Sequence, residues 1–126
     1  MSERQTRVRA LRGATTAPAN DARSIVEATS ELMREIMDRN GLAPEHMVSC
    51  IFTATEDLDA EFPAVAARRL GLEQVPLLCA REMPVPGSLP RVIRVLIHYH
   101  AGEEDPPQHV YLREARSLRE DLQAAQ

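Results

Sequence analysis

Val92-Ile93-Arg94-Val95-Leu96-Ile97 is the stretch that decides the fold, because it is the most apolar run of the chain and carries one permanent cation. Its β-branched residues predict a strand, whose side chains alternate between two faces. Arg94 then shares a face with Val92 and Leu96, and the other face is wholly apolar. A buried, unpaired charge is costly, so a carboxylate of the protein or an anionic ligand should meet Arg94. The alternative is an edge strand whose arginine faces water and blocks edge-to-edge pairing.

The segment 21–40 is predicted to form the one long helix of the chain. Apolar side chains recur in it at intervals of three or four residues. Asn20 or Asp21 can cap its start, and Gly41 can adopt the left-handed conformation after its end. Pro44 prevents the helix from continuing.

The remaining elements are shorter and are predicted from β-branched runs and turn residues. Strands are expected at 7–16, 47–55, 75–79, 92–99 and 109–112, and short helices at 63–70 and 113–122. The order predicts an α/β (α+β) fold with a single mixed β-sheet of about five strands, one long helix and short helices. Residues 1–126 form one domain in this interpretation, with 116–126 as a mobile C-terminal tail. One helical layer cannot cover both faces of such a sheet, so we expect an oligomer.

Composition narrows the class of protein. The chain has 126 residues, a formal net charge of −4, no Trp, two Phe and two Tyr, which argues against nucleic acid as a partner. No apolar run is long enough to span a membrane, and the basic start lacks the apolar segment of a signal peptide. We therefore expect a cytoplasmic protein without a membrane partner. Cys50 and Cys79 lack metal or redox spacing and are expected to be reduced thiols.

The polar residues of the chain offer two kinds of chemistry, metal binding and anion binding. His98 and His100 share a strand face and, with Glu104, could hold a metal as in cupins, but cupins are all-β and the long helix opposes that assignment. Exposed histidines at a strand end are the simpler interpretation. No motif for a nucleophile, phosphate loop or dinucleotide is present. The other candidates are anion-binding groups, each typical of solvated surface when taken alone: Arg12, Arg68, Arg94, Arg119 and Tyr111.

Taken together, these residues lie in motifs that resemble one family. The motifs are Arg12-Gly13-Ala14-Thr15-Thr16, Ala54-Thr55-Glu56-Asp57-Leu58, Phe62-Pro63-Ala64, Val75-Pro76, Cys79, Glu82-Met83, Ile93-Arg94-Val95, His109-Val110-Tyr111-Leu112 and Leu118-Arg119. In order and spacing, from about Val8 to Leu122, the chain resembles the monofunctional, trimeric chorismate mutases of α/β type. The resemblance implies a pseudo-α/β-barrel homotrimer with active sites between subunits. It also implies conversion of chorismate to prephenate, toward phenylalanine and tyrosine, by an intramolecular Claisen rearrangement without cofactor, metal or covalent catalysis.

The resemblance also implies roles for individual residues. Arg94 would stabilise the negative charge that develops on the breaking ether oxygen, with its apolar neighbours supplying dry surroundings. Glu82 and the Cys79 thiol would bind the ring hydroxyl, and these three residues are the expected catalytic groups. Arg12 and Tyr111 would bind the side-chain carboxylate. The further substrate-binding residues implied are Phe62, Ala64, Val65, Arg68 from a neighbouring subunit, Leu77, Leu78, Leu118 and Arg119 from the tail.

Some positions depart from the family pattern. Val65 stands where a lysine is common, Leu78 where a threonine is common, and Glu120 where a proline is common. Val65 and Leu78 predict weaker substrate binding, and Glu120 affects the closure of the site by the tail. Two other interpretations of the same arginines stay open from the sequence. One is a trimer of the enamine/imine deaminase type, which would not require Cys79 and Glu82, and the other is a non-catalytic module that binds carboxylates.

Overall fold

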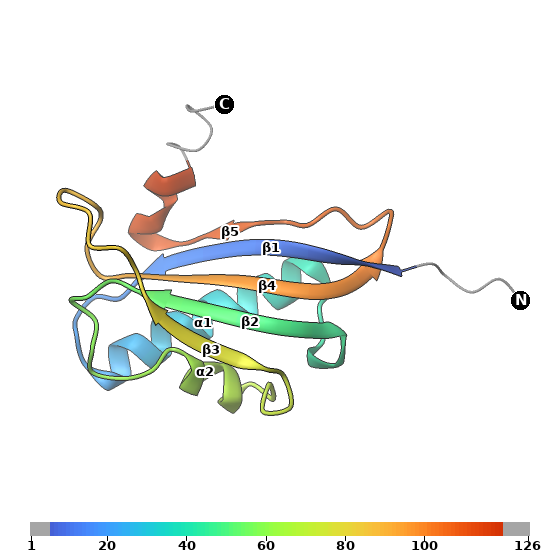
Figure 1. Ribbon diagram of the computed structural model, residues 1–126, viewed down its shortest axis with the longest axis horizontal. Coiled ribbons are helices and arrows are strands. Elements are labelled where there is room, and N and C mark those ends of the chain that lie inside the picture. Colours follow the sequence, from blue (N-terminus) through green and yellow to red (C-terminus); the bar gives the residue numbers. More distant parts are fainter. Residues whose placement is uncertain (1–5, 120–126) are drawn as a thin grey trace, which may run out of the picture.

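The protein is described by a computed structural model that covers residues 6–119 (Figure 1). The strands are β1 (Thr6–Thr16), β2 (Met47–Ala54), β3 (Leu77–Arg81), β4 (Val92–Gly102) and β5 (Val110–Tyr111). The α-helices are α1 (Ala22–Asn40) and α2 (Ala64–Arg69), and the 3-10 helices are η1 (Pro44–His46) and η2 (Arg113–Ala115). Residues 116–119 continue η2 as a helical turn. The fold is therefore the mixed α/β architecture predicted from the sequence.

All five strands form one mixed sheet in the order β3-β2-β4-β1-β5. Strand β4 is antiparallel to both of its neighbours, β1 and β2. The outer pairs, β2 with β3 and β1 with β5, are parallel. The run that contains Arg94 thus lies at the centre of the sheet, and the edge-strand explanation of this arginine is wrong.

Helix α1 begins and ends where its capping residues predict. The Asp21 carboxylate accepts a hydrogen bond from the backbone N–H of Ser24 at 2.7 Å. Gly41 ends the helix in the left-handed conformation, with φ of 54°. The buried side of α1 packs on β1, and a Cβ added to Gly13 would lie 2.6 Å from Cδ1 of Ile36. Glycine at position 13 therefore allows the helix to approach the sheet closely.

Both α-helices lie on the same side of the sheet, the far side in Figure 1. The side chains that point toward them form the main core, which includes Leu11, Leu32, Ile36, Phe52, Val95 and Ile97. The opposite side of the sheet has no helical layer over it among residues 6–119. We call these two sides the core face and the open face. The open face carries large apolar side chains exposed to solvent, such as Val8 and Leu78.

The structure corrects several boundaries. Strand β3 begins and ends two residues later than predicted, and β4 continues to Gly102 instead of ending near Tyr99. The last strand is only two residues long, and the predicted terminal helix starts as a 3-10 turn. Residues 120–126, which hold Glu120 and most of the predicted tail, lie outside the described residues. None of the described helices has the length and apolar character needed to cross a bilayer.

Candidate active site

A cavity of about 490 Å³ lies on the open face where β4, β1 and β2 run side by side. Its lining comes from these three strands, β5 and the C-terminal helical turn: Arg12, Gly13, Ala14, Ile51, Thr53, Arg94, Val95, Leu96, Tyr111 and Leu118. The lining is largely apolar, and its polar side chains are those of Arg12, Thr53, Arg94 and Tyr111. Four residues predicted as site residues, Arg12, Arg94, Tyr111 and Leu118, are thus brought together within one chain.

Arg94 projects from the centre of the sheet into this cavity. Its Nε donates to both carboxylate oxygens of Glu82, at 3.0 and 2.9 Å. No residue within 6–119 accepts a hydrogen bond from its Nη1 or Nη2. The Arg94 side chain is 46% exposed, so a single chain does not supply the dry surroundings expected for it. One side of the guanidinium is held by the protein, and the other remains available to a ligand.

Glu82 lies just beyond the end of β3 and extends the parallel pairing with β2. Its backbone N–H donates to the carbonyl of Ala54 at 3.0 Å. The carboxylate also accepts from the Thr53 hydroxyl, Oγ1 to Oε2, at 2.9 Å. With 16% of the side chain exposed, Glu82 is the more buried partner of the ion pair. The protein's own carboxylate therefore meets the cation that the sequence singled out.

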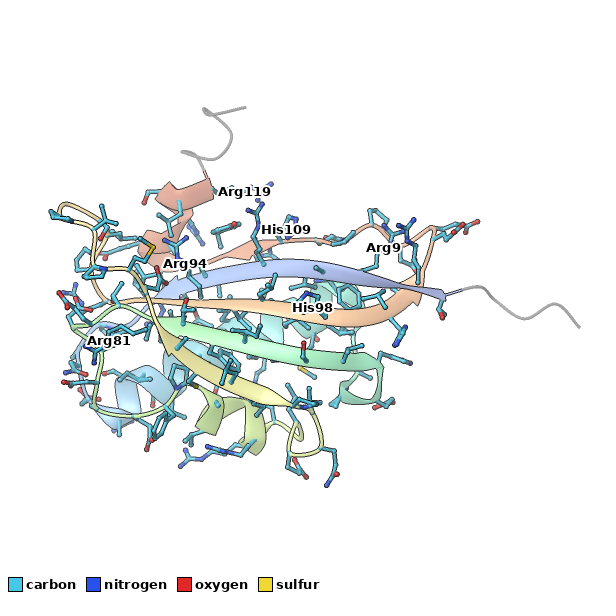
Figure 2. All side chains as sticks on the ribbon, in the orientation of Figure 1. Arg9, Arg81, Arg94, His98, His109 and Arg119 are labelled. Atoms are coloured by element: carbon cyan, nitrogen blue, oxygen red, sulfur yellow. The ribbon has the colours of Figure 1, made fainter. Side chains whose placement is uncertain are left out.

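Arg12 reaches the same cavity from β1, directly opposite Leu96 of β4. Its backbone N–H donates to Nδ1 of His109 at 3.0 Å. Since Nδ1 is the acceptor, the neutral His109 ring carries its proton on Nε2. Desolvation of the ring, the Arg12 charge and the Arg119 charge lower the pKa of His109, in that order of size. Figure 2 shows His109 and Arg119 near the end of the sheet that carries Arg94.

His109 and Thr53 are the two polar residues of this region that the sequence did not identify. His109 lies two residues before Tyr111 in one of the family motifs, but nothing in that motif indicates a contact with the backbone of Arg12. Thr53 stood in a buried strand whose β-branched content explained it. In both cases the signal is the pairing of strands distant in the sequence.

Besides Glu82 and Arg119, which are not lining residues either, a group of seven predicted site residues lies away from the cavity of the same chain. Arg68 is on the exposed side of α2, and Phe62, just before this helix, is 62% exposed. Leu78 lies on the open face of β3 beside Ile51 of β2. The remaining members of this group are Ala64, which is buried, and Val65, Leu77 and Cys79, which are half-buried. All belong to the α2 and β3 side of the molecule, which we call the β3 edge (Figure 1).

The two cysteines lie on the core face. Cys79 pairs with Phe52 of β2 and packs against the main core, so its thiol is on the opposite side of the sheet from Arg94. Cys50 is buried, and desolvation raises its pKa to about 12. Both thiols are free. Within one chain, Cys79 and Glu82 therefore do not act on the same side of the sheet.

The two histidines considered as metal ligands have different surroundings. His98 lies on the open face, where its Nδ1 is 3.2 Å from the Ser49 hydroxyl. His100 is exposed, and Glu104 lies in the turn that follows β4. Within the described part of the chain, no three His, Cys, Asp or Glu side chains gather in a way that could hold a metal ion.

Comparison with known proteins shows the family of this chain. A chorismate mutase AroH of Thermus thermophilus is 51% identical over 121 residues, covering 94% of this chain and 99% of that protein. A chorismate mutase AroH of Bacillus subtilis (strain 168) is 39% identical over 117 residues, covering 91% and 92%. The solved structure of a chorismate mutase from Clostridium thermocellum matches with a TM-score of 0.83 at 45% identity, covering 86% and 98%. The family model for chorismate mutase type I matches residues 8–122, and the chain therefore belongs to the chorismate mutase type I family.

Proposed function

We propose that this protein rearranges chorismate to prephenate in the cavity on its open face, as an isomerase of aromatic amino-acid biosynthesis. The observation that carries the assignment to this cavity is the state of Arg94. Its Nε is fixed by Glu82, while both Nη groups face a largely aliphatic cavity without an acceptor among the described residues. The family match favours this reaction over the deaminase and the non-catalytic carboxylate module.

The reaction suits a site built in this way. One carbon–oxygen bond breaks and one carbon–carbon bond forms within a single molecule, so no nucleophile or proton transfer is required. Negative charge develops on the ether oxygen as its bond to carbon lengthens. The Nη groups of Arg94 donate to that oxygen and stabilise the transition state more than the bound substrate. Removal of one such preorganised donor typically costs about 3 to 4 kcal/mol of activation free energy.

The two carboxylates of chorismate need cationic or hydroxyl partners. Arg12 and the Tyr111 hydroxyl, which line the same cavity as Arg94, bind the side-chain carboxylate in this proposal. Arg119 follows Leu118, a lining residue of the cavity, and would meet the ring carboxylate in this proposal. Fixing both ends of the substrate favours the compact conformer in which the reacting carbons are close.

The β3 edge completes the site from a neighbouring subunit of a homotrimer in this proposal. None of its predicted site residues lines the cavity of its own chain, yet Phe62 and Leu78 are 62% and 59% exposed. Such exposed apolar side chains on one edge and an uncovered sheet face are complementary features of an interface. The neighbour's Phe62 and Arg68 would form the wall and the second cation. Covering the cavity would also remove Arg94 from water.

The direct test follows the loss of the diene absorbance of chorismate in the ultraviolet, with prephenate identified by NMR. We expect rapid, enzyme-dependent conversion, and the absence of any acceleration over the uncatalysed reaction would reject the function. The assembly is tested separately by sedimentation equilibrium, which should give three times the mass of the chain. Leu78→Asp should shift that mass toward the single chain. A monomeric and fully active wild-type protein would overturn the shared site while leaving the reaction intact.

A further inference from the structure

Thr53 occupies a position between the two members of the ion pair. The sheet order places β2 between β3 and β4, so Glu82 and Arg94 approach each other from strands on either side of Thr53. Thr53 is directly opposite Arg94 in the β2–β4 register. Neighbouring strands are about 4.8 Å apart, so β3 and β4 are roughly 10 Å apart, and the two charged side chains meet above β2. Their meeting point is therefore directly over Thr53.

The hydroxyl of Thr53 is directed at one oxygen of this pair. It donates to Oε2 of Glu82 at 2.9 Å, the same oxygen that accepts from Arg94 at 2.9 Å. Oε1 accepts only from Arg94 among the described residues, at 3.0 Å. A carboxylate oxygen has two lone pairs in the plane of the group, so Oε2 is fully used. Oε1 keeps a lone pair that can accept from a bound molecule.

We propose that Thr53 is a positioning residue of the active site, which holds the Glu82 carboxylate so that Arg94 is aimed at the ether oxygen and Oε1 is presented to the substrate hydroxyl. The inference rests on the proposed function of this cavity. An ion pair that uses a single donor nitrogen of Arg94 leaves the carboxylate free to pivot about that nitrogen, so the pair does not fix its own geometry well. Thr53 supplies the missing constraint. Its β-branched side chain has restricted rotamers on a central strand, so the hydroxyl itself is held in place.

Thr53→Val is the informative substitution, because it replaces the hydroxyl by a methyl group of similar volume. A hydrogen bond to a charged group is worth enough to change a rate by about ten- to a hundredfold. We expect kcat to fall by at least about tenfold, with a smaller change in KM, because the aim of Arg94 matters most in the transition state. Thr53→Ser, which restores the donor, should recover most of the lost rate. Thr6→Val makes the same change on an exposed residue at the far end of β1 and should leave the rate unchanged.

A double-mutant cycle separates positioning from a general effect on the fold. If Thr53 acts through Glu82, Thr53→Val should have little further effect on kcat in a Glu82→Gln background. Additive losses in the cycle, or a Thr53→Val enzyme with the kcat of the wild type, would overturn the proposal. Thermal unfolding of each variant identifies any loss that is caused by unfolding.

A measurement made without substrate tests the positioning role of Thr53 separately from the proposed function. The Nε–H proton of Arg94 should be protected from exchange in ¹H–¹⁵N spectra, since both oxygens of a held carboxylate accept it. Thr53→Val should accelerate that exchange, with Thr53→Ser restoring protection and the Nε–H of Arg12 as the internal reference. Unchanged exchange would refute the positioning role even if the wild type converts chorismate. An inactive wild type with the expected exchange pattern would refute the function alone.

Discussion

The core face and the open face of the sheet are built from the same strands, but their side chains have different roles. In β2, Phe52 is fully buried against the helices, whereas its neighbour Ile51 lines the cavity on the other side. In β4, Val95 is buried and Arg94 is exposed. Stability and chemistry are thus assigned to alternate residues of one strand. The difference predicts that adjacent substitutions will have effects of different kinds.

The largest expected effect is on the open face. Arg94→Ala should lower kcat by about a hundred- to a thousandfold, because it removes the donor for the developing negative charge. The measurement is steady-state chorismate turnover, with sedimentation to check that the assembly is intact. Arg34→Ala, which removes an exposed arginine of α1, is the matched control and should change little. Comparable small effects of both substitutions would contradict the role of Arg94.

The next effect contrasts the two faces within β2. Phe52→Ala should lower the free energy of unfolding by about 3 to 5 kcal/mol, because it opens a cavity in the packed core. Ile51→Ala should cost much less, since the side chain it shortens already borders the open cavity. Urea unfolding of both variants at one protein concentration measures the difference. Equal losses would mean that the two faces are packed alike.

A smaller effect is expected at the C-terminal margin of the cavity. Arg119→Ala should raise KM several-fold and change kcat less, because an exposed cation at the margin contributes mainly to binding. The change should diminish at high salt, where exposed charges are screened. A loss confined to kcat would instead place Arg119 with the reacting atoms.

The smallest expected effect is on the pH dependence of stability, through the contact of His109 with β1. The folded state lowers the pKa of His109, so the unfolded chain binds the proton more readily. The contribution of this residue is therefore present above the usual histidine pKa of about 6.5 and is lost as the pH falls below it. We expect His109→Asn, which keeps a side-chain acceptor but does not titrate, to weaken the acid dependence of unfolding. Parallel stability curves for the two proteins between pH 7.5 and 5.5 would exclude this contribution.

Elements with local signals could be predicted from the sequence. The start and end of α1 are determined by Asp21 and Gly41, whose side chain and backbone conformation act within a few residues. The Arg94 strand and the mixed sheet followed from β-branched runs in the same way. The expected family was confirmed by the family model and by relatives that match nearly the whole chain.

Features that depend on pairing between distant segments could not be predicted. The parallel register of β2 with β3 places Cys79 on the core face, whereas Glu82, three residues later, reaches Arg94. A shift of this register by one residue would have turned Cys79 to the open face and Glu82 to the core face. No pattern in a five-residue strand fixes the register. The contacts of Thr53 and His109 depend on the same kind of pairing. The sequence could therefore identify the charged groups of the site but not the neutral residues that hold them.

The central, antiparallel position of β4 limits the insertions and deletions that this strand can tolerate. Insertion or deletion of one residue between Val92 and Arg94 would rotate every later side chain of the strand to the other face. Arg94 would then enter the hydrocarbon interior, and Val95 would take its place over the cavity. A substitution along β4 leaves the other side chains on their faces, whereas a change of length before Arg94 moves the rest of the strand out of register. Any descendant of this sequence that keeps the reaction should preserve the spacing of β4 more strictly than its composition.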